Sequence, residues 1–401
     1  MAAATLERRR GRSSRFPSFA SSRPSSGLVR RFVGWLIGGI AAVSVVMFFL
    51  IGPDISWQLL THGPTTVWDH LEYPTRSLSP SPEPVPWQES EATAGFVDDS
   101  LLDSLEASQS LAFVVVDGGV IVWEWYRDDH GPDTPSMLFS ASKSIVSLLI
   151  GAAIDDGLIG SVDDVVTEYI PELSEGGFDR VTIEDLLRMD SSMDYVEDDN
   201  PIGIHIRFNY TQSLADEILD LEVREASDPV FRYKSGDNAL LGLVLVRALG
   251  DTSLTEYLER RLWHPLGAGN AGSWNVDADG GLERTWCCLA MTARDLARFG
   301  QMVSNGGTWD GERLISEDWI EASVAPGFSP DRWPAEYSGS VLANYGYQWW
   351  VLDDGSHLAL GKAGQYLFVD PTRDVVIVRL GESQGEYSWA TIMQEIASGL
   401  G

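Results

Sequence analysis

The chain has 401 residues, of which 44% are hydrophobic and 22% charged, so it can build a packed core and is not a disordered protein. Its 28 basic and 59 acidic residues give a formal net charge of −31 at pH 7. Eight arginines lie within residues 1–31, so the rest of the chain is more acidic still. Such a surface repels phosphate backbones, which excludes nucleic acid as an expected partner.

An uncharged run of 20 residues extends from Phe32 to Ile51, directly after Arg30 and Arg31. At about 1.5 Å per residue, a helix of this length crosses the ~30 Å hydrocarbon layer. A cleavable signal peptide is the alternative, but its apolar region would be only about 7–15 residues long and would end in small residues. We therefore expect a single-pass anchor at 32–51 in the inner membrane, with residues 1–31 in the cytoplasm and residues 52–401 outside it.

Residues 52–94 contain the repeated prolines of Ser79-Pro-Ser-Pro-Glu-Pro-Val-Pro86, which are typical of a stiff linker. A folded domain is expected over 95–401. It begins with two strands, 111–116 and 120–126, joined by Asp117-Gly118-Gly119, in which Asp-Gly supplies the positive φ that a tight turn needs.

Helical patterns fill the middle of this domain, and strand patterns return at its end. The expected helices are 140–156, 183–189, 213–221, 239–248, 254–263, 292–304 and 316–324. The expected later strands are 347–352, 357–360, 366–369 and 375–380, followed by a helix at 388–400. This order predicts an α+β fold in which both ends build one antiparallel sheet with flanking helices, and residues from about 140 to 340 form an all-helical insertion.

Lysine occurs only three times, as Lys143, Lys234 and Lys362, whereas arginine occurs 25 times. A lysine can lose its proton when it is desolvated and an arginine cannot, so each lysine is a candidate for chemistry. The two cysteines are the neighbours Cys287 and Cys288, which cannot form a disulfide framework or a zinc site. The six histidines have no paired metal-ligand spacing, and we expect neither a metal nor another cofactor.

Ser140 and Lys143 stand three residues apart at the start of an apolar helix, so they share one face of its first turn. Burial would favour the neutral amine, which could take the proton of the Ser140 hydroxyl. The alternative is a serine N-cap followed by a lysine that reaches the surface.

Two further segments carry the other lysines. Tyr233 and Ser235 flank Lys234 just before an apolar helix, where they could share a pocket or simply form the turn that caps the helix. Lys362 begins Lys-Ala-Gly364 at the start of a strand, and a glycine there could let a substrate backbone lie against the strand.

The ordered set S-x-x-K, Y-x-S and K-A-G resembles the serine β-lactamase and penicillin-binding protein superfamily. It is most similar to the class C-like branch, which holds β-lactamase-like esterases, D-stereospecific peptidases and 6-aminohexanoate-dimer hydrolases. Further similar stretches are 160–171, 181–190, 292–300 and 345–350. The resemblance implies a β-lactamase/transpeptidase-like fold for residues 95–401.

The resemblance also implies roles. Ser140 would be the acyl-accepting nucleophile, Lys143 its proton acceptor, and Tyr233 the group that relays a proton to the leaving group. Lys362 would lower the pKa of that tyrosine or hold a substrate carboxylate. The backbone N–H groups of Ser140 and Gln365 would form the oxyanion hole, with Ser235 and Gly364 beside the substrate. Tyr195 loosely matches a tyrosine that closes over substrate in the nylon-oligomer hydrolases.

Two departures affect the substrate. Ser235 stands where the family usually has Asn, and Ala363 replaces the hydroxyl residue of K-T-G. Both changes weaken the grip on a β-lactam, so a small ester or amide is the expected substrate. The alternative substrates are β-lactams or D-Ala-D-Ala cell-wall peptides.

Two other functions compete with this one. Gly381-Glu-Ser383-Gln-Gly385 matches the G-x-S-x-G elbow of α/β-hydrolases, but no Asp or His follows it. A membrane-tethered binding module that keeps the fold without the chemistry is the non-enzymatic alternative.

Overall fold

The structure is a computed structural model, and it divides into two units, Met1–Gly52 and Pro53–Gly401. Within the residues that it describes, no helix is both long and apolar enough to cross a membrane. The predicted anchor at 32–51 lies outside the described residues except for three single positions. The described residues are 53–62, 65–90, 95–198, 200, 202–223, 230–337 and 339–400, with the single positions 31, 35, 39, 48 and 52.

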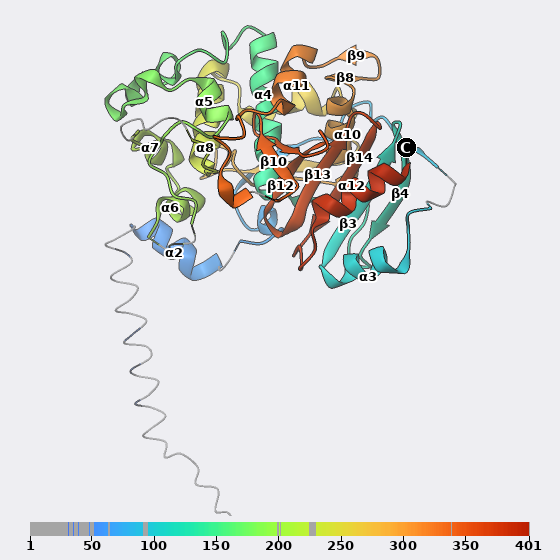
Figure 1. Ribbon diagram of the computed structural model, residues 1–401. Helices are drawn as coiled ribbons and strands as arrows, with labels where there is room; N and C mark the ends of the chain where they lie inside the picture. Colours follow the sequence, from blue (N-terminus) through green and yellow to red (C-terminus); the bar gives the residue numbers. More distant parts are fainter. Residues whose placement is uncertain are drawn as a thin grey trace, which may run out of the picture. The chain divides into compact units, whose positions relative to one another are not determined.

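Both ends of the domain contribute to an eight-stranded sheet, as predicted (Figure 1). Its order is β10-β11-β12-β13-β14-β3-β4-β2, and only the β4–β2 pair is parallel. The two ends meet where β14 pairs with β3, with Val378 opposite Val114. The strands are β2 (Gln88–Glu89), β3 (Ser110–Asp117), β4 (Val120–Tyr126), β10 (Leu342–Tyr345), β11 (Trp350–Leu352), β12 (His357–Gly361), β13 (Gln365–Asp370) and β14 (Val375–Gly381).

Helices cover both faces of this sheet, which explains why its central strands are apolar throughout (Figure 1). Side chains of β3 alternate between two cores because successive residues of a strand point to opposite faces. Val114 and Val116 pack in the core that includes α10 (Ala293–Ser304). Phe113 packs in the other core, with α12 (Trp389–Leu400) and α3 (Asp99–Ala107).

The helices expected between the two β-rich ends are present, with ends shifted by a few residues. Helix α4 (Ser142–Asp155) is buried almost all round, as its continuous apolar sequence predicts. The sequence interpretation missed α6 (Ile204–Tyr210), a helix of seven residues. The remaining helices of this part are α5 (Ile183–Leu187), α7 (Leu214–Leu219), α8 (Ser235–Leu249), α9 (Leu254–Leu258) and α11 (Glu317–Val324).

The expectation that residues 140–340 are all helical is wrong. A second sheet has the order β1-β6-β7-β5, with β1 (Thr75–Leu78) and β5 (Ser136–Met137) at its edges. Its two inner strands, β6 (Gly272–Asn275) and β7 (Leu289–Met291), lie in this part of the chain. They have four and three residues, too few to display the period-2 alternation by which strands are recognised. Short strands β8 (Thr308–Trp309) and β9 (Glu312–Arg313) form a third sheet.

The expectation that residues 52–94 are a linker is also wrong. Pro53–His62 forms helix α2, β1 (Thr75–Leu78) pairs with β6, and β2 pairs with β4. The proline-rich stretch between them bonds to the domain, since Ser81 N–H donates to the Ala268 carbonyl. Proline keeps a segment extended whether it is free or packed, so its composition could not reveal the partner.

Candidate active site

Ser140 lies in the 3-10 helix η2 (Phe139–Ala141), directly before α4. Phe139 has a φ of 48°, a left-handed conformation that bulky residues rarely adopt. The turn approaches β12 so closely that a Cβ on Gly361 would collide with the Leu138 carbonyl. A strained turn and a glycine together hold the Ser140 hydroxyl beside the sheet, and Ser140 lines a pocket there.

Lys143 is brought to Ser140, as the three-residue spacing predicts. Its Nζ lies 2.8 Å from Ser140 Oγ and donates to the Trp286 carbonyl at 2.9 Å. The side chain is buried, with 1% exposed. Burial lowers the pKa of Lys143 to about 8, and the negative charge of Glu197 opposes this shift. The amine is therefore the best-placed proton acceptor for the Ser140 hydroxyl.

Tyr233 joins the same cluster. Its hydroxyl hydrogen-bonds to the Ser140 side chain, and Lys143 Nζ lies 5.0 Å from the centre of its ring. The ring stacks on Trp350 at 5.7 Å. Burial and the charge of Glu197 raise the pKa of Tyr233, so its phenol keeps its proton over the physiological range. A neutral phenol against Ser140 suits a group that passes a proton to a leaving group.

Lys362 does not lower the pKa of Tyr233, so that part of the prediction is wrong. The pKa of Tyr233 is raised, and Lys362 Nζ instead donates to Thr65 Oγ1 at 3.3 Å. Lys362 is exposed and lines the same pocket as Ser140. Its predicted alternative role, holding a substrate carboxylate, fits this position.

Lys234, the third lysine, points elsewhere. Its Nζ lies 2.8 Å from Asp237 Oδ2, and both side chains are almost fully buried. The same Nζ donates to the Met189 carbonyl at 3.3 Å. Lys234 therefore ties the start of α8 to the chain after α5 and does not belong to the Ser140 cluster.

Ser235 lines the pocket, but its N–H and hydroxyl both donate to the carboxylate of Glu197. Its N–H donates to Glu197 Oε2 at 2.6 Å and its hydroxyl to Oε1 at 2.7 Å. His205 Nδ1 lies 3.6 Å from the same carboxylate. Glu197 was not predicted, because no motif contains it, although it stands only two residues after Tyr195.

Gly364 is a glycine for a different reason from the one predicted. Its φ is 82°, and a Cβ would collide with the guanidinium of Arg379. That buried arginine donates to the carbonyls of Gly364 and Ser383 at 2.5 and 2.6 Å. The glycine makes room for Arg379 behind the K-A-G turn, and the Ser383 turn is bound to the same side chain.

Gln365 follows this turn at the start of β13, in register with Gly361. Its buried side chain donates to the Gly381 carbonyl at 2.6 Å and accepts from the Gly381 N–H at 3.2 Å. These bonds fix the peptide whose N–H is predicted to face the oxyanion.

Tyr195 does not close over the pocket. It is 7% exposed and packs against the start of α8, where a Cβ on Gly236 would meet its ring. Its hydroxyl lies 2.9 Å from His205 Nδ1. Burial raises the pKa of Tyr195 well above its usual value. The tyrosine therefore supports His205, which lines the pocket, from behind.

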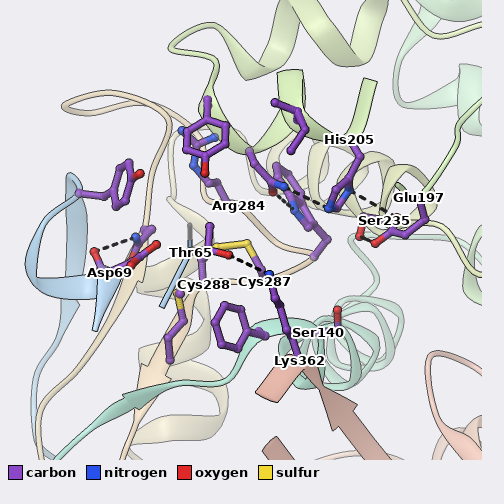
Figure 2. Close-up of a pocket in the computed structure, with 18 residues that line it drawn as sticks. Thr65, Asp69, Ser140, Glu197, His205, Ser235, Arg284, Cys287, Cys288 and Lys362 are labelled. Atoms are coloured by element: carbon purple, nitrogen blue, oxygen red, sulfur yellow. Dashed lines mark hydrogen bonds and ion pairs between the residues drawn. A yellow bond between two sulfur atoms is a disulfide. The ribbon is translucent and has the colours of Figure 1, made fainter. Parts of the chain in front are cut away.

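The pocket beside Ser140 has a volume of about 380 Å³ and mixed chemistry (Figure 2). Acidic Asp69 and Glu197, basic Arg284 and Lys362, and several aromatic side chains line it. Arg284 is buried and donates to the carbonyls of Phe208 and Thr211, both at 2.9 Å. Of these lining residues, only Lys362 was predicted. The others come from segments that are far apart in the sequence and meet only in the folded chain.

Cys287 and Cys288 form a disulfide with each other, and both line this pocket (Figure 2). Within the described residues, no group of three or more His, Cys, Asp or Glu side chains could hold a metal ion.

The beta-lactamase family model matches residues 99–391 of the chain. The chain belongs to the beta-lactamase family. The 6-aminohexanoate-dimer hydrolase of Paenarthrobacter ureafaciens is 33% identical over 297 residues, which are 69% of this chain and 73% of that protein. With Ser140 and Lys143 in contact, this relationship identifies a serine hydrolase of the β-lactamase type, as predicted.

Solved structures share the fold at lower identity. A Bacillus anthracis protein provisionally assigned as a 6-aminohexanoate-dimer hydrolase has a TM-score of 0.68 at 21% identity, with 88% of this chain and 96% of that chain covered. A family VIII carboxylesterase has a TM-score of 0.58 at 15% identity, with coverage of 76% and 99%. A class C beta-lactamase mutant has a TM-score of 0.58 at 16% identity, with coverage of 78% and 100%.

Proposed function

We propose that this protein hydrolyses small esters and linear amides through an acyl-enzyme on Ser140. The contact between Ser140 Oγ and the buried Lys143 Nζ carries the proposal. With a pKa of about 8, roughly a tenth of the Lys143 side chains are neutral at pH 7, a usable fraction for a general base. A binding module without catalytic activity would gain nothing from a buried lysine whose charged form is destabilised by desolvation.

In the acylation step, Ser140 Oγ attacks the substrate carbonyl while its proton passes to neutral Lys143. The backbone N–H groups of Ser140 and Gln365 would hold the negative oxygen. Tyr233 then gives its phenolic proton to the leaving alcohol or amine and recovers one from Lys143. Water attacks the acyl-enzyme in the second step, and the same groups return the proton to Ser140.

Esters are the preferred substrates in this proposal. An alkoxide leaves more readily than an amine, so an ester tolerates an imperfect proton relay. The N–H and the hydroxyl of Ser235 both donate hydrogen bonds to Glu197, and Ala363 has no hydroxyl. Neither residue is therefore placed to hydrogen-bond the amide or the carboxylate of a β-lactam. The relationship to a 6-aminohexanoate-dimer hydrolase adds linear amides with a chain-end charge as candidates.

A substrate panel tests this preference. We expect kcat/KM for p-nitrophenyl acetate and butyrate to exceed that for a chromogenic cephalosporin by at least about 10²-fold, since two amide-binding groups are altered. A linear aminohexanoate dimer and a D-Ala-D-Ala peptide complete the panel, each run with Ser140→Ala as the blank. A cephalosporin as the best substrate would contradict the preference and favour β-lactamase activity.

Glu197 should set the pH profile. Its negative charge favours the charged form of Lys143 and raises the pKa of Tyr233. In Glu197→Gln both pKa values should fall, so the acid limb of the kcat/KM profile, which Lys143 sets, should move to lower pH. The acid limb of the wild-type enzyme is expected near pH 8.

The matched control is Glu172→Gln, which removes an exposed carboxylate paired with Arg247. This variant should leave the acid limb in place. An acid limb that stays near pH 8 in Glu197→Gln, or moves upward, would contradict the assignment of Lys143 as the titrating base.

We propose that residues 32–51 anchor the enzyme in the inner membrane with its catalytic domain outside the cytoplasm. The support is the uncharged run itself and the two arginines before it. A reporter fused after Gly401 that works only outside the cytoplasm should be active, and the full-length protein should sediment with membranes. A soluble chain beginning near Gly52 would mean that a signal peptide had been removed.

A further inference from the structure

The Cys287–Cys288 disulfide closes a ring of eight atoms that contains the peptide bond between the two residues. Each cysteine is only 8% exposed, and Cys288 has a φ of 74°, a left-handed conformation that non-glycine residues rarely adopt. The disulfide therefore restrains the backbone at one point of the pocket wall.

This restrained peptide is adjacent to the carbonyl that holds Lys143. Lys143 Nζ donates to the Trp286 carbonyl at 2.9 Å, and that carbonyl belongs to the peptide bond between Trp286 and Cys287. The carbonyls of the two cysteines are held by β6 instead. Trp274 Nε1 donates to the Cys287 carbonyl at 3.1 Å, and Asn275 N–H donates to the Cys288 carbonyl at 3.0 Å.

A disulfide between neighbours cannot stabilise the fold in the usual way. A cross-link gains stability by closing a loop in the unfolded chain, and this one encloses no residues between its ends. The chain has no other cysteine with which either residue could pair. What the bond does is local: it fixes the conformation of two residues beside the Ser140 pocket.

We propose that the closed Cys287–Cys288 ring is a positioning element for Lys143, required for full turnover. The proposal rests on the proposed function, in which Lys143 is the base for Ser140. Reduction by a dithiol opens the ring: two electrons and two protons pass to the sulfurs, giving two thiols, and the dithiol becomes its own cyclic disulfide. The Trp286 carbonyl then loses its restraint, and Lys143 loses its fixed orientation toward Ser140.

The first test uses the unmodified protein. Wild type is incubated with and without dithiothreitol, and opening is verified by mass spectrometry as a gain of ~2 Da and two alkylated thiols. We expect kcat for p-nitrophenyl acetate to fall at least about 10-fold in the reduced enzyme, while KM changes less than about threefold, because a displaced base impairs chemistry rather than binding. Reoxidation with oxidised glutathione should restore kcat.

The second test removes the ring by substitution. The Cys287→Ser/Cys288→Ser variant should match the reduced wild type in kcat and should not respond to dithiothreitol. Should this variant fail to fold, as judged by circular dichroism, the reduced wild type still decides the question. A fully reduced wild type with unchanged kcat would overturn the proposal, as would free thiols in the active enzyme purified without reductant.

Failure of this proposal is separable from failure of the proposed function. Labelling of Ser140 by a fluorophosphonate in the oxidised enzyme tests the function alone. An oxidised enzyme that is labelled, and a reduced enzyme that turns over equally fast, would leave the serine hydrolase in place and remove only the role of the disulfide.

Discussion

Ser140→Ala is expected to lower kcat for p-nitrophenyl butyrate by at least about 10³-fold, because no acyl-enzyme can form without the hydroxyl. The far-UV circular dichroism spectrum should not change, since the Ser140 side chain is small and lines the pocket beside Lys143 and Tyr233. The burst of p-nitrophenol and the labelling by a fluorophosphonate should both disappear.

The matched control is Ser383→Ala, which alters the serine of the G-x-S-x-G stretch. Ser383 binds Arg379 through its carbonyl, and its hydroxyl accepts from the Gly385 N–H at 3.1 Å, so loss of this hydroxyl should leave kcat nearly unchanged. Activity that survives Ser140→Ala and vanishes with Ser383→Ala would overturn the assignment of the nucleophile.

Lys143→Met is expected to lower kcat by a similar factor and to raise the free energy of unfolding at pH 7. Burial lowers the pKa of Lys143 from 10.5 to about 8, so between these values the unfolded chain binds more protons than the folded one. Wild-type stability should therefore rise with pH from about 8 to 10.5, and the full cost of the buried charge should be present below pH 8.

That shift of the pKa means that the buried charge of Lys143 lowers the free energy of unfolding by about 3 kcal/mol at pH 7. Lys143→Met removes this cost but also loses the two hydrogen bonds of Nζ, which offsets part of the gain. A net gain of about 1–2 kcal/mol should appear as a higher Tm in thermal unfolding. The variant should also lack the rise in stability above pH 8.

Lys234→Met supplies the opposite control. Lys234 is also buried, but it is paired with Asp237, and its removal leaves that carboxylate buried without its cation. The cost of such a change is about 3–5 kcal/mol, so Tm should fall. A lower Tm for Lys143→Met as well would mean that Lys143 contributes to the fold rather than straining it.

The parts of the site that could be predicted are those encoded by local spacing. Ser140 and Lys143 stand in one helical turn, so three residues of separation were sufficient to bring their side chains together. Tyr233 required the family motif, because nothing local connects it with Ser140. The sheet could be predicted because its strands are long enough to reveal their pattern and their turns.

The parts that could not be predicted depend on partners distant in the sequence. Glu197 reaches Ser235 across 38 residues, and Lys143 reaches the Trp286 carbonyl across 143. Gly364 was recognised as special, but its role depends on Arg379 behind it. The short strands β6 and β7 become recognisable only once β1, contributed from outside the predicted domain, is beside them.

The segment from Thr65 to Ser90 also determines how the catalytic domain can be cut from its chain. A fragment that starts at Gly95 would strip β1 from β6 and leave that edge strand open to pairing with other molecules, which favours aggregation. It would also lose Thr65, the partner of Lys362 at the pocket. A fragment without the N-terminal tail should therefore include Thr65 and all the residues after it.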